Sequence, residues 1–485
     1  MTAADRPALA ARVDALVDPD ALLADAPRVR DALDAAGWSA GALDDLLGVT
    51  ARTHLDRDEL APLLRRTADG SPLSTLARLF VAGVPVDAGA AGRAGVPRSW
   101  LAADGSALVR LQPVRHGGLE VLCPHDPGRA ATGVHPDQVL GVGAASLTLA
   151  AATPRDVVGR VLDLGTGCGV QALLADDSCG DVVATDRNPR ASAYARLAAA
   201  LGRTELDVRT GDLLEPVEGE RFDLVVSNPP FVVGPGRRYT YRDSGLGGDE
   251  VCRRLVQGLP AHLADDGLAV LLVNWLHLEG EDGDERVRSW FAGTGCDGWV
   301  VQRELAAPED YVTAWLRDTD EGPRFDTLYE QWLDALAGVE AIAFGVLAMR
   351  AGGRERVTLD EVDQPVAATW GEQVRAHFGA LDLLDTDLRE ARLRLREDVR
   401  LHSVARRTDD GWYADAQLLQ QEAGLRWSGG VDPYGATLLA GCDGTRRLGD
   451  LLAVLASSAG LSEGEAAEQV LPVVGQLVRQ GFLVG

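Results

Sequence analysis

The chain has 485 residues, of which 46% are hydrophobic and 25% charged, so it has enough apolar surface for two or three folded domains. It contains no lysine, which excludes a Walker P-loop and a Schiff-base enzyme, since both need a lysine amine. The formal net charge is −26, and a field of that sign disfavours non-specific nucleic-acid binding because it repels phosphates.

The cysteines and the N-terminus indicate the compartment. Six cysteines stand at positions 123, 168, 179, 252, 296 and 442, with no CxxC pair and no metal-ligand spacing. This pattern is typical of free thiols in a reducing compartment and predicts no bound metal. We find neither a signal peptide nor a run of about 18 apolar residues, so we expect a cytoplasmic protein without membrane contact. No pattern indicates the oligomeric state.

The first part of the chain, residues 1–125, is predicted to be a helical domain that ends in a β-hairpin. Leucines and valines recur at three- and four-residue spacing from about residue 7 to residue 82, as on the buried faces of a small helical bundle. Two strand-like runs follow at 107–112 and 119–123, joined through Gly117 and Gly118. We expect this domain to help in docking a substrate.

Residues 126–370 have the pattern of an α/β domain with a mostly parallel sheet. Apolar runs buried on both faces alternate with helical stretches, as in a series of βαβ units. The runs are Val161–Leu164, Val182–Asp186, Leu206–Arg209, Leu224–Asn228, Leu268–Val273 and Trp299–Gln302. A later run, Ala341–Met349, is expected to form an antiparallel edge strand. Together these runs predict a Rossmann-like domain.

Residues 371–485 are expected to form a C-terminal helix, a hairpin and a winged-helix-like module. The hairpin is predicted around Thr408–Trp412, and two leucine- and valine-rich helices precede a closing strand at 482–484. Two arginine groups stand out from the acidic average: Arg237, Arg238 and Arg242 form one, and Arg389, Arg392, Arg394 and Arg396 form the other. We interpret the second group as solvated helix faces and loop charges, and the acidic surroundings of the C-terminal module favour packing over nucleic-acid reading.

A glycine turn after the first strand of the α/β domain is the sharpest local motif. Gly165, Gly167 and Gly169 let the backbone approach a ligand closely, and Asp186 ends the next strand, where a carboxylate accepts both hydroxyls of a ribose. Val170 stands where the dinucleotide pattern GxGxxG needs its last glycine. The turn therefore favours S-adenosylmethionine over NAD, because no pyrophosphate needs the helix N-terminus.

Two further carboxylates are candidates for the same cofactor. Asp163 precedes the turn and suits the cationic amino-acid end of S-adenosylmethionine, with a purely structural role as the alternative. Asp212 follows the third strand, where it would accept a hydrogen bond from the adenine amine, with a helix N-cap as the alternative. Both lie at predicted carboxyl ends of strands, where open α/β sheets bind ligands.

The second motif, Asn228-Pro229-Pro230-Phe231, follows the fourth strand of this domain. Two prolines remove two backbone donors, so the carbonyls and the Asn228 side-chain oxygen form a site of acceptors only. Such a site fits an NH₂ group, whose lone pair then faces the methyl donor, while Phe231 stacks on the flat amide or base. The motif predicts methyl transfer to a planar nitrogen by orientation alone, and an ordinary turn is the alternative.

The segments LDLGTGCG, TDRNP and SNPPF resemble the class I methyltransferases of the small-domain group over about residues 125–350. This group includes HemK-like release-factor glutamine methyltransferases and ribosomal-RNA guanine-N2 methyltransferases. The resemblance implies that Gly165, Gly167, Gly169 and Asp186 bind S-adenosylmethionine. It also implies that the residues from Asn228 to Phe231 hold the nitrogen to be methylated, with Asn228 beside the cofactor as well.

The motifs leave the methyl acceptor open. Phe231 is frequent in the RNA enzymes of the group, whereas the segment Ser244–Val251 is similar to eukaryotic-type release-factor methyltransferases. We expect a protein glutamine amide, with an exocyclic amine of ribosomal RNA or a small natural product as alternatives. A dinucleotide oxidoreductase is opposed by Val170 and by the Asn228 motif. A catalytically silent binding protein is opposed by the intact glycine turn.

Overall fold

The computed structural model describes residues 17–55, 59–127, 135–156, 159–234, 248–318, 324–409 and 411–485. The chain splits into two compact units, one of residues 1–150 with 157–361 and the other of 151–156 with 362–485. The division into three domains at residues 125 and 370 stays a prediction. Arg237, Arg238, Arg242 and the first half of the Ser244–Val251 segment lie outside the described residues.

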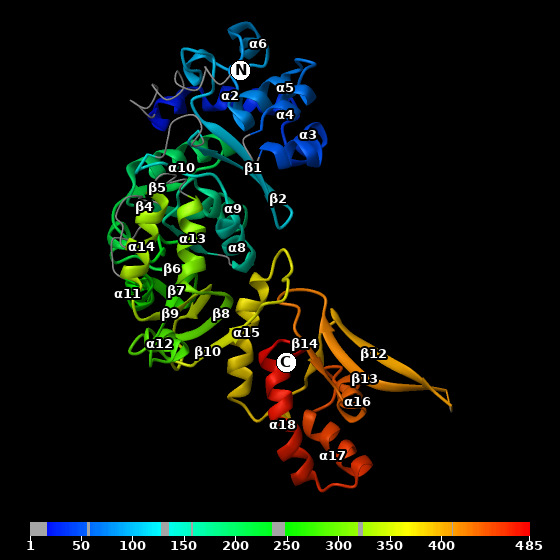
Figure 1. Cartoon of the computed structure of the whole chain (residues 1–485). Coiled ribbons are helices and arrows are strands. Elements are labelled where there is room, and N and C mark those ends of the chain that lie inside the picture. The colour runs from blue at the N-terminus through cyan, green and yellow to red at the C-terminus, as the bar shows by residue number, and fades with distance from the viewer. Residues whose placement is uncertain are drawn as a thin grey trace. The chain divides into compact units, whose positions relative to one another are not determined.

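The start of the first unit is helical, as predicted (Figure 1). Its helical segments are η1 (Pro19–Asp25), α2 (Ala26–Ala35), α3 (Ala40–Leu55), α4 (Ala61–Arg66), α5 (Pro72–Leu76), η2 (Ala77–Ala82), α6 (Ala88–Arg93) and η3 (Arg98–Trp100). Asp18, Ser71 and Asp87 each precede such a segment and accept a hydrogen bond from a backbone N–H of its first turn. These caps satisfy donors that a helix start leaves unpaired.

A hairpin joins these helices to the sheet of the same unit. Strands β1 (Arg110–His116) and β2 (Leu119–His125) pair antiparallel around Gly117 and Gly118, as predicted. Buried residues of the helices and the hairpin share one apolar core with residues of α10 (Pro189–Gly202), a helix that covers the sheet. Burial of this apolar surface fixes the helical region against the sheet domain.

The sheet has eight strands in the order β10-β8-β9-β7-β6-β3-β4-β5. The strands are β3 (Arg160–Leu164), β4 (Asp181–Asp186), β5 (Asp207–Thr210), β6 (Phe222–Ser227), β7 (Leu263–Leu278), β8 (Asp297–Ala306), β9 (Val339–Arg350) and β10 (Val357–Glu361). From β5 through β7 all neighbours pair in parallel, so the carboxyl ends of β3, β4, β5 and β6 share one edge. The predicted Rossmann-like, mostly parallel sheet is confirmed.

The strand predicted at the edge of the sheet lies inside it. β9 is antiparallel, as expected, but it is inserted between β7 and β8, and β10 forms the edge by pairing in parallel with β8. The unbroken apolar run of β9 is buried on both faces, which suits an interior position. A Cβ at Gly345 would lie 2.4 Å from the carbonyl oxygen of Val301, so the glycine permits this close pairing.

Helices cover the sheet and lead into its strands. They are α8 (Ala144–Ala152), α9 (Val170–Cys179), α10, η4 (Glu215–Val217), α11 (Glu250–Gly258), η5 (Leu259–His262), α12 (Gly283–Ser289), α13 (Pro308–Asp318) and α14 (Phe325–Ala335). The Asn188 side chain accepts a hydrogen bond from the Arg190 N–H and caps α10. α9 follows β3 and α10 follows β4, so both helices start at the edge of the sheet where those strands end.

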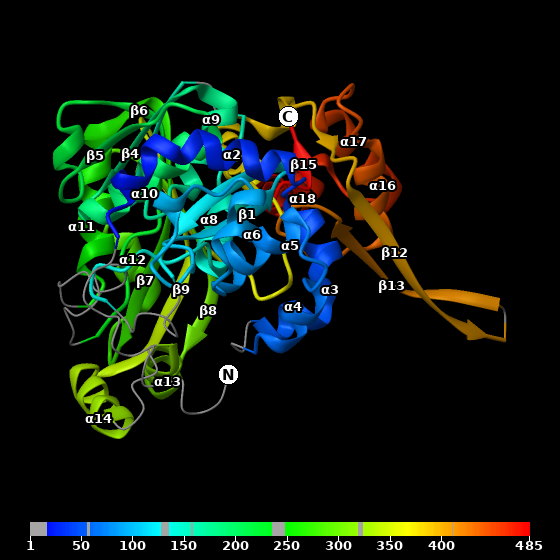
Figure 2. The ribbon, with the colours of Figure 1, turned by 90° about the horizontal axis from the view of Figure 1, so that it is seen from above.

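The second unit combines helices with a long hairpin. Its elements are α15 (Gly371–Leu384), η7 (Leu388–Glu390), β11 (Arg394–Leu395), β12 (Val399–Thr408), β13 (Gly411–Gln421), β14 (Ser428–Gly430), α16 (Pro433–Gly441), α17 (Leu448–Ala459), α18 (Glu463–Arg479) and β15 (Leu483–Val484). β12 and β13 form the predicted hairpin and extend away from α16 and α17 (Figure 2). The hairpin precedes the three last helices, and the winged-helix-like character stays a prediction.

The second arginine group lies in a turn, in loop residues and in a short strand, which agrees with the loop charges of the sequence interpretation and not with a helix face. α15 ends at Leu384, Arg389 belongs to the short turn η7, and Arg394 belongs to β11. Asp387 starts that turn and accepts hydrogen bonds from the backbone and the side chain of Arg389. This local capping competes with helix continuation, which explains why the helical pattern breaks here.

The described part of the chain contains no helix that is both long and apolar enough to cross a membrane. Within the same residues no group of three or more His, Cys, Asp or Glu side chains is arranged to hold a metal ion. The five cysteines whose side chains are described are free and buried: Cys123, Cys168, Cys252, Cys296 and Cys442.

Candidate functional site

A pocket of about 390 Å³ opens at the carboxyl ends of β3, β4 and β6. Its walls come from four segments of the first unit: the glycine turn with the start of α9, the end of β4, the residues from Ser227 to Val232, and the segment 138–146 before and in α8. The start of α10, Gly211–Leu213 after β5, Val251, Arg254 and Leu255 of α11, and Trp315 of α13 complete the lining. Ligands of open α/β sheets bind at this kind of edge.

Most of the site residues predicted from the sequence meet at this pocket. Its lining includes Asp163, Gly165, Gly167, Asp186, Asp212, Asn228, Pro229, Pro230 and Phe231. Gly169 does not belong to the lining. A Cβ on Gly169 would lie 3.3 Å from the Cβ of Ala198 and 3.4 Å from the Cα of Ala195, so this glycine serves the close packing of α9 on α10.

The glycine turn is fixed against the neighbouring strand. The backbone N–H groups of Gly165 and Thr166 both donate to the carbonyl oxygen of Thr185, at 2.8 and 2.9 Å. Gly165 and Gly167 have φ angles of 77° and 56°, a region that glycine adopts without strain. A Cβ at Gly165 would lie 3.9 Å from the backbone oxygen of Asn228, so the turn approaches the start of the second motif.

Asp163 is a buried carboxylate beneath the turn. It is 1% exposed, and its Oδ2 accepts hydrogen bonds from the Thr166 hydroxyl at 2.7 Å and from the Ala172 N–H at 2.9 Å. Burial raises the pKa of Asp163 to about 6, although both hydrogen bonds favour the charged form, and the nearby Asp186 carboxylate raises it further. The side chain thus holds a negative charge at neutral pH at the cost of desolvation.

Asp186 ends β4 and faces the same pocket. Its Oδ1 accepts a hydrogen bond from the Asn188 N–H at 2.8 Å, and its Oδ2 accepts one from the Gly167 N–H at 3.0 Å. Burial raises the pKa of Asp186, and these two hydrogen bonds oppose the rise. Each carboxylate oxygen has a second lone pair, so two further donors, such as a pair of hydroxyls, suit this side chain.

Other polar atoms of the pocket await partners. Among the described residues, Thr185 Oγ1 and Gln171 Oε1 are buried without a hydrogen-bond partner, and both residues line the pocket. Asp212 is exposed at the rim, and the short helix η4 begins after Leu214 without a side-chain cap, so the helix N-cap alternative for Asp212 does not hold. Buried polar atoms without partners are costly, and a polar ligand in the pocket would satisfy them.

The second motif forms the wall opposite the turn. The Ser227 hydroxyl donates to the carbonyl oxygen of Leu164 at 2.8 Å and joins the ends of β6 and β3. Asn228 is half-buried in the lining, whereas Pro229 and Phe231 are buried. The Phe231 ring lies 5.6 Å from the ring of Phe344 in β9. The prolines leave this wall poor in backbone donors, as the sequence suggested.

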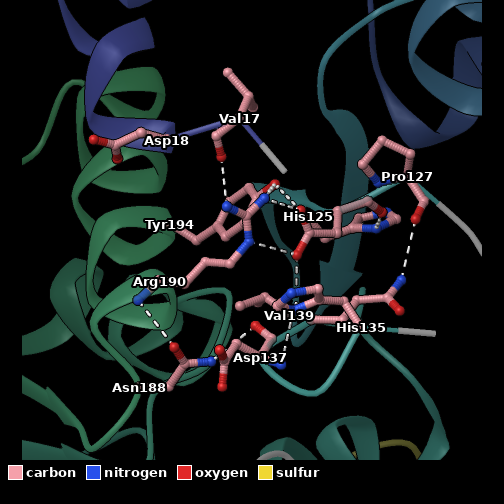
Figure 3. Close-up of polar contacts among 12 residues, drawn as sticks. Val17, Asp18, His125, Pro127, His135, Asp137, Val139, Asn188, Arg190 and Tyr194 are labelled. Atoms are coloured by element: carbon pink, nitrogen blue, oxygen red, sulfur yellow. Dashed lines mark hydrogen bonds and ion pairs between the residues drawn. The ribbon is translucent and has the colours of Figure 1, made fainter. Parts of the chain in front are cut away.

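A buried ionic cluster, which no sequence motif indicates, supports the wall that runs from Gln138 to Gly141. The Asp126 carboxylate accepts hydrogen bonds from the Arg190 guanidinium, from the Tyr194 hydroxyl at 2.7 Å and from the Val139 N–H at 2.8 Å. Figure 3 shows Arg190 and Tyr194 of α10 facing the segment that carries Val139. The Asn188 Nδ2 also donates to the Asp137 carbonyl at 3.0 Å.

Sequence reasoning missed several lining residues. Gln138, Gln171 and Thr185 are polar residues that belong to no recognised motif, and Trp315 lies on a helix far along the chain from Asn228. Asn188 lies in the TDRNP segment. Its capping role comes from its place directly before Pro189, the first residue of α10. Only the folded chain brings Trp315 and Gln138 to the same pocket.

Comparison with known proteins identifies the central segment. The family model described as "Methyltransferase small domain" matches residues 130–279. This match confirms the resemblance to the small-domain methyltransferase group for that part of the chain. Two other family models, each described as a domain of unknown function, match residues 35–115 and 375–485.

Curated relatives match part of the chain. A release factor glutamine methyltransferase of Xylella fastidiosa is 39% identical over 167 residues, covering 32% of this chain and 58% of that protein. A release factor glutamine methyltransferase of Cereibacter sphaeroides is 40% identical over 126 residues, covering 23% and 45%. A ribosomal protein uL3 glutamine methyltransferase of Bradyrhizobium diazoefficiens is 33% identical over 125 residues, covering 23% and 39%. The chain spans about half the length of these relatives.

Proposed function

We propose that the chain is an S-adenosylmethionine-dependent methyltransferase that methylates the side-chain amide nitrogen of a protein glutamine. The observation that carries this proposal is one pocket in which two carboxylates, the buried Asp163 and the half-buried Asp186, lie across from an acceptor-rich wall at Asn228–Phe231. The two carboxylates suit a nucleoside that carries an amino acid, and the wall at Asn228–Phe231 suits an NH₂ group.

The polar groups of the pocket suit S-adenosylmethionine. Asp186 offers two lone pairs for the ribose hydroxyls, and Asp163 offers a negative charge for the cationic amino-acid end. Gly165 and Gly167 leave room for close approach, and the unpaired Thr185 Oγ1 and Gln171 Oε1 supply further polar contacts. Asp212 at the rim is our candidate for the adenine amine. When bound, the cofactor supplies a methyl group on a sulfonium, which is an electrophile.

The Asn228 motif orients the nitrogen that attacks this methyl group. The Asn228 side-chain oxygen and the Pro229 carbonyl accept the two hydrogens of an NH₂ group, which turns the nitrogen lone pair towards the cofactor. Phe231, which is buried against Phe344, offers an apolar face for the flat amide. Because Pro229 and Pro230 lack N–H groups, no backbone donor of these residues competes for the lone pair.

Two observations favour a protein acceptor over RNA. The curated relatives named above are glutamine methyltransferases of a release factor and of a ribosomal protein. The net charge of −26 also disfavours the approach of a polyanion. The bare amide of glutamine fits the site's two acceptors, and a reducing, cytoplasmic setting agrees with the free thiols.

A labelling experiment tests the proposal. The enzyme is incubated with S-adenosylmethionine that carries a labelled methyl group and with lysate from a strain that lacks the enzyme. We expect the label in the protein fraction, where it survives ribonuclease and is lost on protease treatment. Label that survives protease but not ribonuclease would shift the acceptor to RNA, and label in neither fraction would contradict a macromolecular acceptor.

A further inference from the structure

Two helices outside the motifs contact the chain as it leaves the Asn228–Phe231 wall. α13 and α14 follow β8 and precede β9, and they lie beside each other (Figure 2). Their buried residues Val312, Leu316 and Trp332 share an apolar cluster with Val232 and Val233, the two residues directly after Phe231. The position of the motif therefore depends on this pair of helices.

Tyr311 of α13 makes a polar contact with the backbone beyond Phe231. Its hydroxyl oxygen accepts a hydrogen bond from the Val233 N–H at 2.9 Å and another from the Asn274 Nδ2 at 3.4 Å. Tyr311 is 7% exposed and Asn274 is 2% exposed. A buried hydrogen bond to a backbone N–H is costly to lose, so this contact fixes the chain two residues after Phe231.

Gly234 adds a second point of contact. A Cβ at this position would lie 2.8 Å from the Cη2 atom of Trp332 in α14, so only glycine lets the backbone lie this close to the indole ring. Trp332 is 4% exposed and belongs to the same cluster. Residues 232–234 are thus held by a hydrogen bond from one helix and by an aromatic face from the other.

Trp315 extends α13 to the pocket itself. It lies one helical turn after Tyr311, and the two rings are 6.1 Å apart at 64°. Trp315 is half-buried and lines the pocket together with Phe231 and Arg254. Because Tyr311 contacts both the Trp315 ring and the Val233 N–H, Trp315 reaches the pocket from the side of the motif that follows β6.

We infer that α13 is the acceptor-positioning element of the enzyme. Tyr311 is a positioning residue that holds the Asn228–Phe231 wall through Val233, and Trp315 forms an aromatic wall that selects a slender, planar acceptor such as a carboxamide side chain. This inference rests on the proposed function, because it concerns the acceptor side of the same pocket. It assigns roles to residues that neither motif contains.

Tyr311→Phe tests the positioning role, with Tyr329→Phe in α14 as the matched control. Tyr329 stacks on Phe325, so its substitution changes a tyrosine of the neighbouring helix without touching the Val233 contact. We expect Tyr311→Phe to lower the rate of methyl transfer to lysate protein about tenfold, with unchanged affinity for S-adenosylhomocysteine and faster hydrogen exchange at the Val233 amide. A rate within twofold of the wild type, or an equal loss of cofactor affinity, would overturn the positioning role.

Trp315→Ala and Trp315→Phe test the selecting wall. We expect Trp315→Ala to raise the apparent KM for lysate protein about five- to tenfold. Trp315→Phe should have an apparent KM close to that of the wild type, because the smaller ring keeps an aromatic face. A wild-type KM in Trp315→Ala would overturn the selecting role. Failure of the proposed function looks different, since the wild-type enzyme would then transfer no methyl group to protein.

Discussion

The buried carboxylate of Asp163 makes the sharpest prediction, because its two possible roles predict different cofactor affinities after the same substitution. Asp163→Asn keeps the size of the side chain and one acceptor oxygen but cannot ionise. If Asp163 is a cofactor ligand, the variant binds S-adenosylhomocysteine more weakly and is more stable without it. If Asp163 is purely structural, through its bonds from Thr166 and Ala172 to one oxygen, the variant binds S-adenosylhomocysteine nearly as well as the wild type.

The raised pKa of Asp163 gives the size of the expected changes in stability and in cofactor affinity. Burial moves the pKa of Asp163 from 3.8 to about 6, so in the folded protein the charged form is disfavoured by about 3 kcal/mol relative to the unfolded chain. The contribution of Asp163 to the free energy of unfolding therefore falls as the pH rises from about 4 to about 6 and stays low above that. An asparagine escapes this penalty, which gives up to about 3 kcal/mol of stability at pH 7.5.

The same pKa predicts how cofactor affinity depends on pH. If the Asp163 carboxylate binds the cationic amino group of the ligand, it must be charged. At pH 6 half of the free protein has a protonated, uncharged Asp163. The affinity for S-adenosylhomocysteine should therefore fall about tenfold, or about 1.4 kcal/mol, between pH 7.5 and pH 5. Burial also raises the pKa of Asp186, so Asp163→Asn retains a smaller pH dependence and does not lose it completely.

Titration calorimetry from pH 5 to pH 8 and thermal unfolding at pH 7.5 measure these effects. We expect Asp163→Asn to bind S-adenosylhomocysteine about 1.5–3 kcal/mol more weakly at pH 7.5, to unfold at a higher temperature and to have a flatter pH profile. A variant that is less stable than the wild type, with the same affinity and the same pH profile, would refute the reasoning.

Three further predictions concern other residues of the first unit. Asp186→Ala should weaken S-adenosylhomocysteine binding by about 1.5–3 kcal/mol in calorimetry, because hydrogen bonds to a charged acceptor are lost; unchanged affinity would contradict the ribose role. Asn228→Ala should lower methyl transfer about 10²-fold, because the nitrogen loses its orientation, with calorimetry giving wild-type cofactor affinity; wild-type turnover would reduce the motif to a turn. Asp126→Ala should lower the free energy of unfolding in urea by about 3–5 kcal/mol, because it leaves Arg190 buried without its partner, whereas Asp20→Ala, which breaks a half-exposed pair with Arg196, should cost less than about 1 kcal/mol; equal losses would contradict the account of the cluster.

The sequence predicted those parts of the fold that depend on local patterns. Apolar runs predicted the strands β3, β4, β5 and β6 close to their observed bounds and the middle of β7, which extends five residues further at each end than the run Leu268–Val273. Strands buried on both faces are uninterrupted apolar runs in sequence. Gly165 and Asp186 could be placed at one edge because the carboxyl ends of parallel strands share it. The hairpin of β12 and β13 was predicted from the turn residues around Gly411.

The parts that the sequence did not predict depend on packing between distant segments. The place of β9 inside the sheet required the later strand β10 to form the edge, and β10 has no clear apolar pattern. Gly169 looks identical to Gly165 in the motif, and only the nearness of Ala198 shows that it packs a helix. The contact of Tyr311 with Val233 joins residues 78 positions apart, and no local pattern reports it.

The most direct test of the central claim is the chemical identity of the methylated residue. Lysate protein labelled by the wild-type enzyme with isotopically marked S-adenosylmethionine is digested and sequenced by mass spectrometry, with Asn228→Ala as the control. The account predicts a labelled methyl group on the side-chain nitrogen of glutamine, present with the wild type and nearly absent with the variant. A labelled methyl group on oxygen, sulfur or carbon, or equal labelling by both proteins, would contradict it.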